Sequence, residues 1–105
     1  MNPQFLFQQG VSLHQKGDLA EAEKSYRQLL AAEPGFSRAW QLLATLLYQQ
    51  SRLSEALQAA EEASRLEPGA AEICNLRGVL LQASGRREEA LVSFRNAVAR
   101  KPDYA

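Results

Sequence analysis

The chain has 105 residues, with 12 basic and 12 acidic side chains, a formal net charge of zero, 46% hydrophobic residues and a single cysteine. A neutral chain argues against nucleic acid and anionic membranes as partners, since both attract proteins with a clear basic excess. One cysteine cannot form an internal disulfide, and no run of about 18 apolar residues is present that would cross a bilayer.

The N-terminal 17 residues predict no secretory signal. Their only basic residue, Lys16, comes late, and Gln4, Gln8, Gln9 and Gly10 interrupt the apolar residues. A signal peptide needs a basic start followed by an unbroken apolar stretch. We therefore expect a cytoplasmic protein.

A period of 34 residues organises the whole chain. Pro34, Pro68 and Pro102 are 34 residues apart, and columns of Glu, Ala, Leu and small residues keep the same step. Such a period is typical of stacked helical repeats, in which each unit buries its apolar face against its neighbours. We divide the chain into units 3–36, 37–70 and 71–104, which form a single domain over residues 3–104.

The first unit predicts helices over 3–16 and 20–33. Gly17 tolerates the positive φ that ends a helix, and Asp18 with Glu21 has the spacing of a capping box. We expect Asp18 to satisfy free N–H groups of the second helix. Pro34 ends that helix, because the residue before a proline avoids the α region.

The later units repeat this pattern. In the second unit, Trp40, Leu43 and Leu47 recur at helical spacing, which predicts helices over 37–50 and 54–67. The third unit predicts helices over 71–84 and 88–101. Small residues in both helices are expected to let the two backbones of a pair approach closely, while aromatic and aliphatic columns fill the space between neighbouring pairs. The columns are Gly10, Ala44 and Gly78; Ala22, Ala56 and Ala90; and Tyr26, Ala60 and Phe94.

The period and these columns resemble the tetratricopeptide repeat family over Pro3–Tyr104, with Trp40 at the family's aromatic position. Three positions depart from the pattern: Gln9 and Arg77 replace the usual leucine, and Cys74 replaces tryptophan. The resemblance implies an all-α, right-handed solenoid of six helices, with no separate capping helix. Its first helices would line a concave groove and its second helices the convex back. Such proteins mostly bind other proteins without chemistry of their own.

The same resemblance implies which side chains line the groove. These are Phe7, Val11, His14, Arg38, Gln41, Leu42, Thr45, Tyr48, Asn75, Leu76, Val79 and Gln82, flanked by Gln4, Gln8 and Glu72. The apolar strip within this set, Phe7, Val11, Leu42, Leu76 and Val79, fits an apolar-anchored peptide or an amphipathic helix, with ordinary core between repeats as the alternative. The family's carboxylate clamp and its asparagine ladder are both absent, because the clamp positions hold Phe7, Val11, Leu42, Glu72 and Leu76 and the ladder positions hold Gln8, Leu42 and Leu76.

The residues present predict no catalysis, metal or cofactor. His14 and Cys74, the only soft metal ligands, lie two repeats apart and are too few for a zinc site. We interpret His14 as a solvated groove residue and Cys74 as a packed one. The expected partner is a protein or peptide ligand.

The last predicted helix carries apolar residues with no following unit to cover them: Leu91, Val92, Phe94 and Val98. Two explanations are open. The chain is either the N-terminal part of a longer protein, which we favour, or a unit that stacks on another copy of itself. A longer protein would include the case of a glycosyltransferase or sulfotransferase whose substrate-recognition arm is this domain.

Overall fold

A computed structural model describes residues 2–100, and the prediction that the last repeat ends at Tyr104 lies outside them. The described residues contain no strand, which confirms the all-α class. The elements are α1 (Pro3–Gln15), α2 (Leu19–Ala32), α3 (Ser37–Gln49), α4 (Leu53–Leu66), α5 (Ala71–Ala83) and α6 (Arg87–Arg100). The predicted bounds are correct within one residue at each described helix end.

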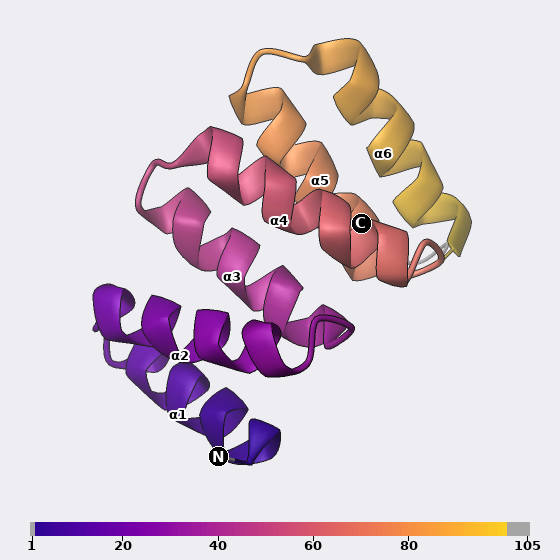
Figure 1. The fold of residues 1–105 in the computed structure, drawn as a ribbon. Helices are drawn as coiled ribbons and strands as arrows, with labels where there is room; N and C mark the ends of the chain where they lie inside the picture. The colour runs from indigo at the N-terminus through magenta and orange to yellow at the C-terminus, as the bar shows by residue number, and fades with distance from the viewer. Residues whose placement is uncertain (1, 101–105) are drawn as a thin grey trace.

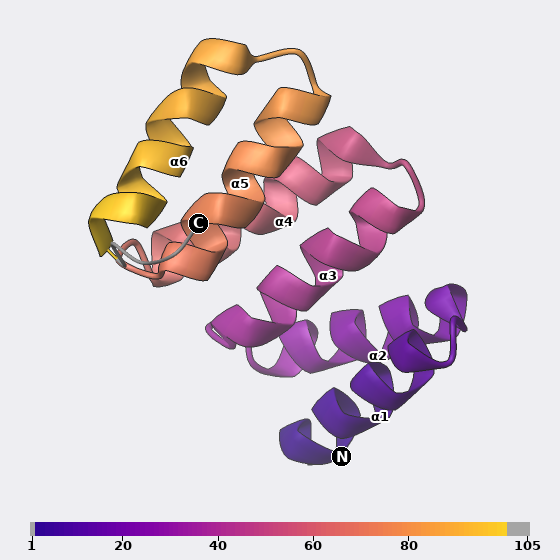
Figure 2. The same cartoon turned by 180° about the vertical axis from the view of Figure 1, so that it is seen from behind.

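The six helices form three antiparallel pairs that stack along one direction, with α1 and α6 at opposite ends of the stack (Figure 1). Within the stack, α2 packs against α3 and α4 packs against α5. Figure 2 shows the same order from behind, with α3 and α5 following α1 along the stack. The molecule measures 40 × 25 × 22 Å.

The turn inside each pair has the same hydrogen bonds in all three repeats. Gly17, Ser51 and Gly85 have φ angles of 83°, 62° and 82°. The N–H of the residue after each of them donates to a leucine carbonyl in the last turn of the preceding helix, at 2.8–2.9 Å. This six-to-one bond closes a Schellman motif, which needs a left-handed residue at this position. The leucine column at 13, 47 and 81 therefore also marks the carbonyls that accept these bonds.

The predicted capping box at Asp18 is wrong. Asp18 stands at the N-cap of α2, but its side chain makes no capping hydrogen bond. Its backbone, at φ −85° and ψ 72°, lies outside the extended region from which a cap side chain usually reaches back. The capping side chain seen in α1 is Asn2, whose Oδ1 accepts a 2.9 Å bond from the N–H of Gln4.

Two aromatic rings pack inside their own helix pair, not between pairs as predicted. A Cβ atom on Gly10 would lie 2.6 Å from Cε1 of Tyr26, and one on Gly78 would lie 2.6 Å from Cε1 of Phe94. The missing side chains of the glycines therefore make room for the rings. The middle repeat solves the same problem with two small residues, because Ala44 and Ala60 are both fully buried.

Charged side chains tie neighbouring pairs together. Glu23 on α2 accepts 2.8 Å bonds from Arg27 and from Arg52, which directly precedes α4. Arg77 on α5 pairs with Glu61 on α4 and donates a 3.0 Å bond to the buried hydroxyl of Ser93 on α6. The arginine that departs from the family pattern thus connects three helices.

Candidate functional site

A hollow of about 490 Å³ lies between α1 and α3. Its lining residues are Phe7, Val11, His14, Gln15, Tyr26, Arg38, Leu42 and Gln49. Five of them belong to the groove predicted from the sequence, and Gln15, Tyr26 and Gln49 do not. The hollow is of the size that proteins use to hold small ligands or a few side chains, about 300–1,000 Å³.

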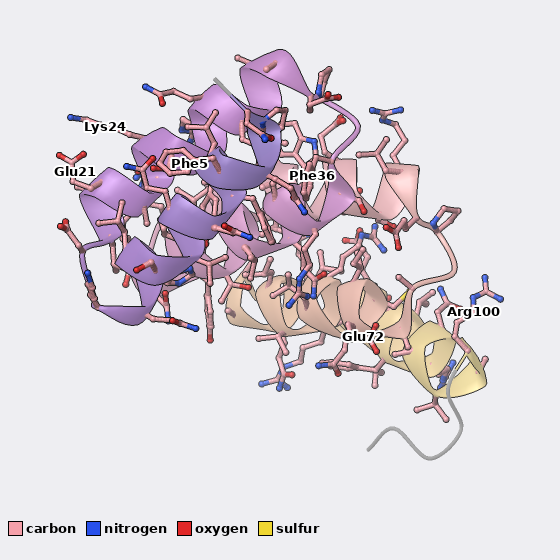
Figure 3. All side chains as sticks on the ribbon, turned by 90° about the horizontal axis from the view of Figure 1, so that it is seen from below. Phe5, Glu21, Lys24, Phe36, Glu72 and Arg100 are labelled. Atoms are coloured by element: carbon pink, nitrogen blue, oxygen red, sulfur yellow. The ribbon has the colours of Figure 1, made fainter. Side chains whose placement is uncertain are left out.

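The apolar side of the hollow is made by Phe7, Val11 and Leu42. All three are half-buried and pack against the core, so each turns part of its surface inward and leaves part exposed. The ring of Phe7 lies against Phe36, with centroids 5.0 Å apart. Figure 3 marks Phe36, which directly precedes α3. The alternative of ordinary core therefore accounts for part of this strip, and the remaining surface faces the hollow.

The polar side of the hollow is a chain of hydrogen bonds across three helices. His14 Nδ1 lies 3.1 Å from the hydroxyl of Tyr26, and His14 Nε2 lies 2.7 Å from Oε1 of Gln49. A neutral imidazole with its proton on Nε2 makes both bonds, because Tyr26 then donates to Nδ1 and Nε2 donates to Gln49. The interpretation of His14 as simply solvated is wrong, since both of its ring nitrogens have protein partners.

Burial keeps the Tyr26 hydroxyl protonated. It raises the pKa of Tyr26 to about 12, and the nearby positive charge of Arg38 opposes this rise. A buried phenol favours its neutral form because a phenolate would lose its hydration. Tyr26 therefore keeps its hydroxyl proton throughout the neutral pH range.

Arg38 stands exposed at the rim. Its Nη1 donates a 3.3 Å bond to the amide oxygen of Gln41, and it makes no ion pair with any residue that the structure describes. The hydroxyl of Thr45 donates to the backbone carbonyl of Gln41 at 3.1 Å, so that hydroxyl is already used within α3.

The other predicted groove residues lie on α3 and α5 and do not line this hollow. Asn75, Leu76 and Val79 are half-buried, whereas Tyr48 and Gln82 are exposed. Gln82 contributes to a smaller hollow of about 270 Å³ near α6. On α6, Phe94 is half-buried, while Leu91, Val92 and Val98 are 48–53% exposed, as predicted for an uncovered last helix.

Two features were missed from the sequence. The first is the exposed Phe5 on α1 (Figure 3), since Ala39 and Ile73 are buried at the corresponding positions. The second is a hollow of about 770 Å³ among α2, α3 and α4, lined in part by Trp40 and Glu61.

The position that holds tryptophan in one repeat and cysteine in the next keeps the same contact. Nε1 of Trp40 donates to the carbonyl of Pro34 at 2.8 Å, and the buried Cys74 lies with its sulfur 3.9 Å from the carbonyl of Pro68. Each side chain thus connects its helix to the loop that precedes it.

The described residues include no group of three or more His, Cys, Asp or Glu placed to hold a metal ion. Among the described helices, none is both long and apolar enough to span a membrane.

Among solved structures, the first repeat domain of Spaghetti (RPAP3) bound to the HSP90 peptide SRMEEVD has a TM-score of 0.93 at 19% identity, covering 96% of this chain and 80% of that one. The protein YrrB, described as having an unusual peptide-binding site, has a TM-score of 0.90 at 21% identity, covering 99% of this chain and 54% of that one.

A third structure is the K341M mutant of an O-GlcNAc transferase from Thermobaculum terrenum, with a TM-score of 0.90 and 27% identity. The comparison covers 97% of this chain and 20% of the transferase, so the chain spans only about a fifth of that enzyme. No curated protein matches the sequence. Family models described as tetratricopeptide repeat match residues 7–71 and 71–104. The chain therefore belongs to the tetratricopeptide repeat family.

Proposed function

We propose that the chain is a non-catalytic interaction module that binds a peptide or an amphipathic helix of a partner protein in the groove formed by α1, α3 and α5. The observation that carries the proposal is the hollow of about 490 Å³, whose apolar side presents the exposed parts of Phe7, Val11 and Leu42. A ligand side chain placed there removes apolar surface from water on both partners, which favours association.

The polar side of the hollow supplies orientation. Gln15 and Gln49 present amides, and Arg38 presents a guanidinium, beside the apolar surface. Ligand sites combine a mostly apolar lining with a few placed polar groups in this way. The similarity to two solved proteins whose descriptions mention peptides agrees with a peptide ligand.

The test replaces two groove leucines, Leu42→Glu with Leu76→Glu, and measures binding of peptides selected from a displayed random library. We expect the double variant to keep its helical circular dichroism and to lose binding, because a carboxylate in the apolar strip must be desolvated on association. Val92→Glu is the matched control, since Val92 is 53% exposed on α6 and outside the hollow. Val11→Ser removes less apolar surface and serves if the double variant unfolds. Undiminished binding by the variants would overturn the proposal.

A second candidate is self-association through α6. Leu91 and Val98 are 53% and 48% exposed, whereas Leu30, which corresponds to Val98 in the first repeat, is 7% exposed. A second copy packing on α6 would cover this surface. Sedimentation velocity over a range of concentrations measures it: association that Leu91→Glu abolishes supports the candidate, and a monomer at every concentration excludes it.

A third candidate makes the chain the substrate-recognition arm of a larger enzyme. The similarity to the O-GlcNAc transferase, at 27% identity, favours it. Substrate turnover by the intact parent protein, with and without residues 3–104, tests this candidate. A parent protein that lacks any catalytic domain would exclude it.

A further inference from the structure

We infer that the hollow between α1 and α3 selects an acidic peptide segment, which places an aliphatic side chain on Phe7, Val11 and Leu42 and an Asp or Glu carboxylate beside Arg38. This inference rests on the proposed peptide-binding function and specifies the chemistry of the ligand. We assign the carboxylate to a side chain of the peptide, not to its C-terminus. Arg38 is the only cation in the lining, and the several cations with which the family binds a C-terminal carboxylate are absent.

The residues that line the hollow carry charge of one sign only. Of its eight lining residues, only Arg38 carries a formal charge when His14 is neutral, and none is Asp or Glu. Desolvated charges need a partner of opposite sign, so a basic ligand finds no carboxylate in the lining while an acidic ligand finds a guanidinium. The lining therefore favours acidic over basic segments.

Arg38 differs from most arginines of the described chain in its partners. Five arginines pair with glutamates: Arg27, Arg52, Arg65, Arg77 and Arg86. Arg38 instead bonds a neutral amide, Gln41, at 3.3 Å. An incoming carboxylate replaces this long bond without breaking an ion pair and gains a charge-assisted, bidentate contact.

Tyr26 and His14 do not compete with Arg38 for the anion. With the His14 proton on Nε2, the hydroxyl of Tyr26 donates to His14 and His14 donates to Gln49, so these donors are occupied. The positive charge of Arg38 lowers the pKa of Tyr26, against the larger effect of burial. Arg38 and Leu42 both line the hollow, so a ligand side chain held on Leu42 lies on the same surface as the guanidinium.

The first measurement is a selection from a random 12-residue peptide library, displayed so that no peptide has a free C-terminus, against the wild type and Arg38→Glu. Wild-type binders should be enriched in Asp or Glu near an aliphatic residue. Binders of Arg38→Glu should lose this enrichment and gain Lys or Arg. A wild-type selection without acidic enrichment would overturn the inference.

The second measurement is fluorescence anisotropy with one selected peptide, synthesised with an amidated C-terminus, and with its Glu→Gln version. Arg38→Gln should lower the affinity for the acidic peptide about two- to fivefold, which is the range expected for an ion pair near the surface. Its affinity for the Gln version should be unchanged. The difference in affinity for the acidic peptide between the wild type and Arg38→Gln should shrink at about 1 M salt, where the screening length is about 3 Å. An Arg38→Glu protein should recover affinity with a Glu→Lys peptide.

Arg95→Gln is the matched control, because it removes the same charge from an exposed arginine outside the hollow. Equal weakening by Arg95→Gln and Arg38→Gln would show a general effect of net charge and overturn the inference. Peptides that bind without acidic preference, yet lose binding to Leu42→Glu, would overturn the inference and leave the proposed function standing. Absence of any groove-dependent peptide binding would overturn the proposed function itself.

Discussion

Replacing Gly10 by alanine tests how the first helix pair is packed. The new Cβ would lie 2.6 and 2.8 Å from two ring carbons of Tyr26, well inside the roughly 3.5–4.0 Å of a carbon contact. The ring is held in place, because Tyr26 is fully buried and its hydroxyl is bonded to His14. Either the ring moves and strains that bond, or α1 and α2 separate.

Two opposing effects set the magnitude. Alanine in a helix interior is favoured over glycine by about 0.5–1 kcal/mol, whereas overpacking a core costs about 1–3 kcal/mol. We expect Gly10→Ala to lower the free energy of unfolding by about 1–2 kcal/mol. Gly78→Ala meets Phe94 at the same 2.6 Å, but Phe94 is half-buried and has no hydroxyl to hold it. Its ring can yield, so the net change there should be near zero.

Urea denaturation followed by far-UV circular dichroism measures these differences. A second background, Tyr26→Leu, removes the ring and leaves a side chain that can move aside. In that background Gly10→Ala should become stabilising by about 0.5–1 kcal/mol, because only the gain in helix propensity remains. A stabilising Gly10→Ala in the wild type, or an equal effect in both backgrounds, would refute the packing argument.

Two further predictions concern the turns and the ion pairs. Ser51→Gly should raise the free energy of unfolding by about 0.5–1 kcal/mol in the same assay, because Ser51 has a φ of 62°, where an L side chain is strained; a loss of stability would contradict this. The hydrogen bond from Arg52 holds the pKa of Glu23 below its usual 4.5, so the stability of this pair is complete above pH 4.5 and is lost as the pH falls through the lower, folded-state pKa. Thermal midpoints measured against pH should therefore fall less in acid for Glu23→Gln than for the wild type, and parallel curves would count against the pair.

The fold follows from the sequence because each unit repeats the same stop signal. Glycine at 17 and 85 marks the left-handed residue that closes each turn, and the leucine four positions before it supplies the accepting carbonyl. The capping-box prediction failed at Asp18 because its residue type and spacing match a helix cap, whereas the preceding turn sets a backbone angle from which its side chain does not cap the helix. Local pattern predicts where helices end, and the geometry of the turn decides which side chain caps them.

The candidate site was predictable only in part. The resemblance to the repeat family implies that Phe7, Val11, Arg38 and Leu42 line one groove, and the structure brings them to the same hollow. The bond from His14 to Gln49 depends on how far α1 and α3 slide past each other, and no column of the sequence encodes that stagger.

Tyr26 could have been found from the sequence. A glycine at the first-helix position accompanies an aromatic at the second-helix position in the outer repeats, as in Gly10 with Tyr26, while the middle repeat has Ala44 with Ala60. This compensation of volume indicates two side chains that share one space. Reading the columns in pairs would have placed the ring over α1 and its hydroxyl near His14.

The same contacts connect the stability of the first pair with the shape of the groove. Gly10 fixes the ring of Tyr26, the hydroxyl of Tyr26 fixes His14, and His14 joins α1 to α3 through Gln49. These two helices are the walls of the hollow. A core substitution that shifts the ring must therefore change the hollow as well, whereas Gly78→Ala, with no such chain of bonds behind Phe94 among the described residues, must leave it unchanged. In this chain the packing of one glycine and the binding surface form a single mechanical unit.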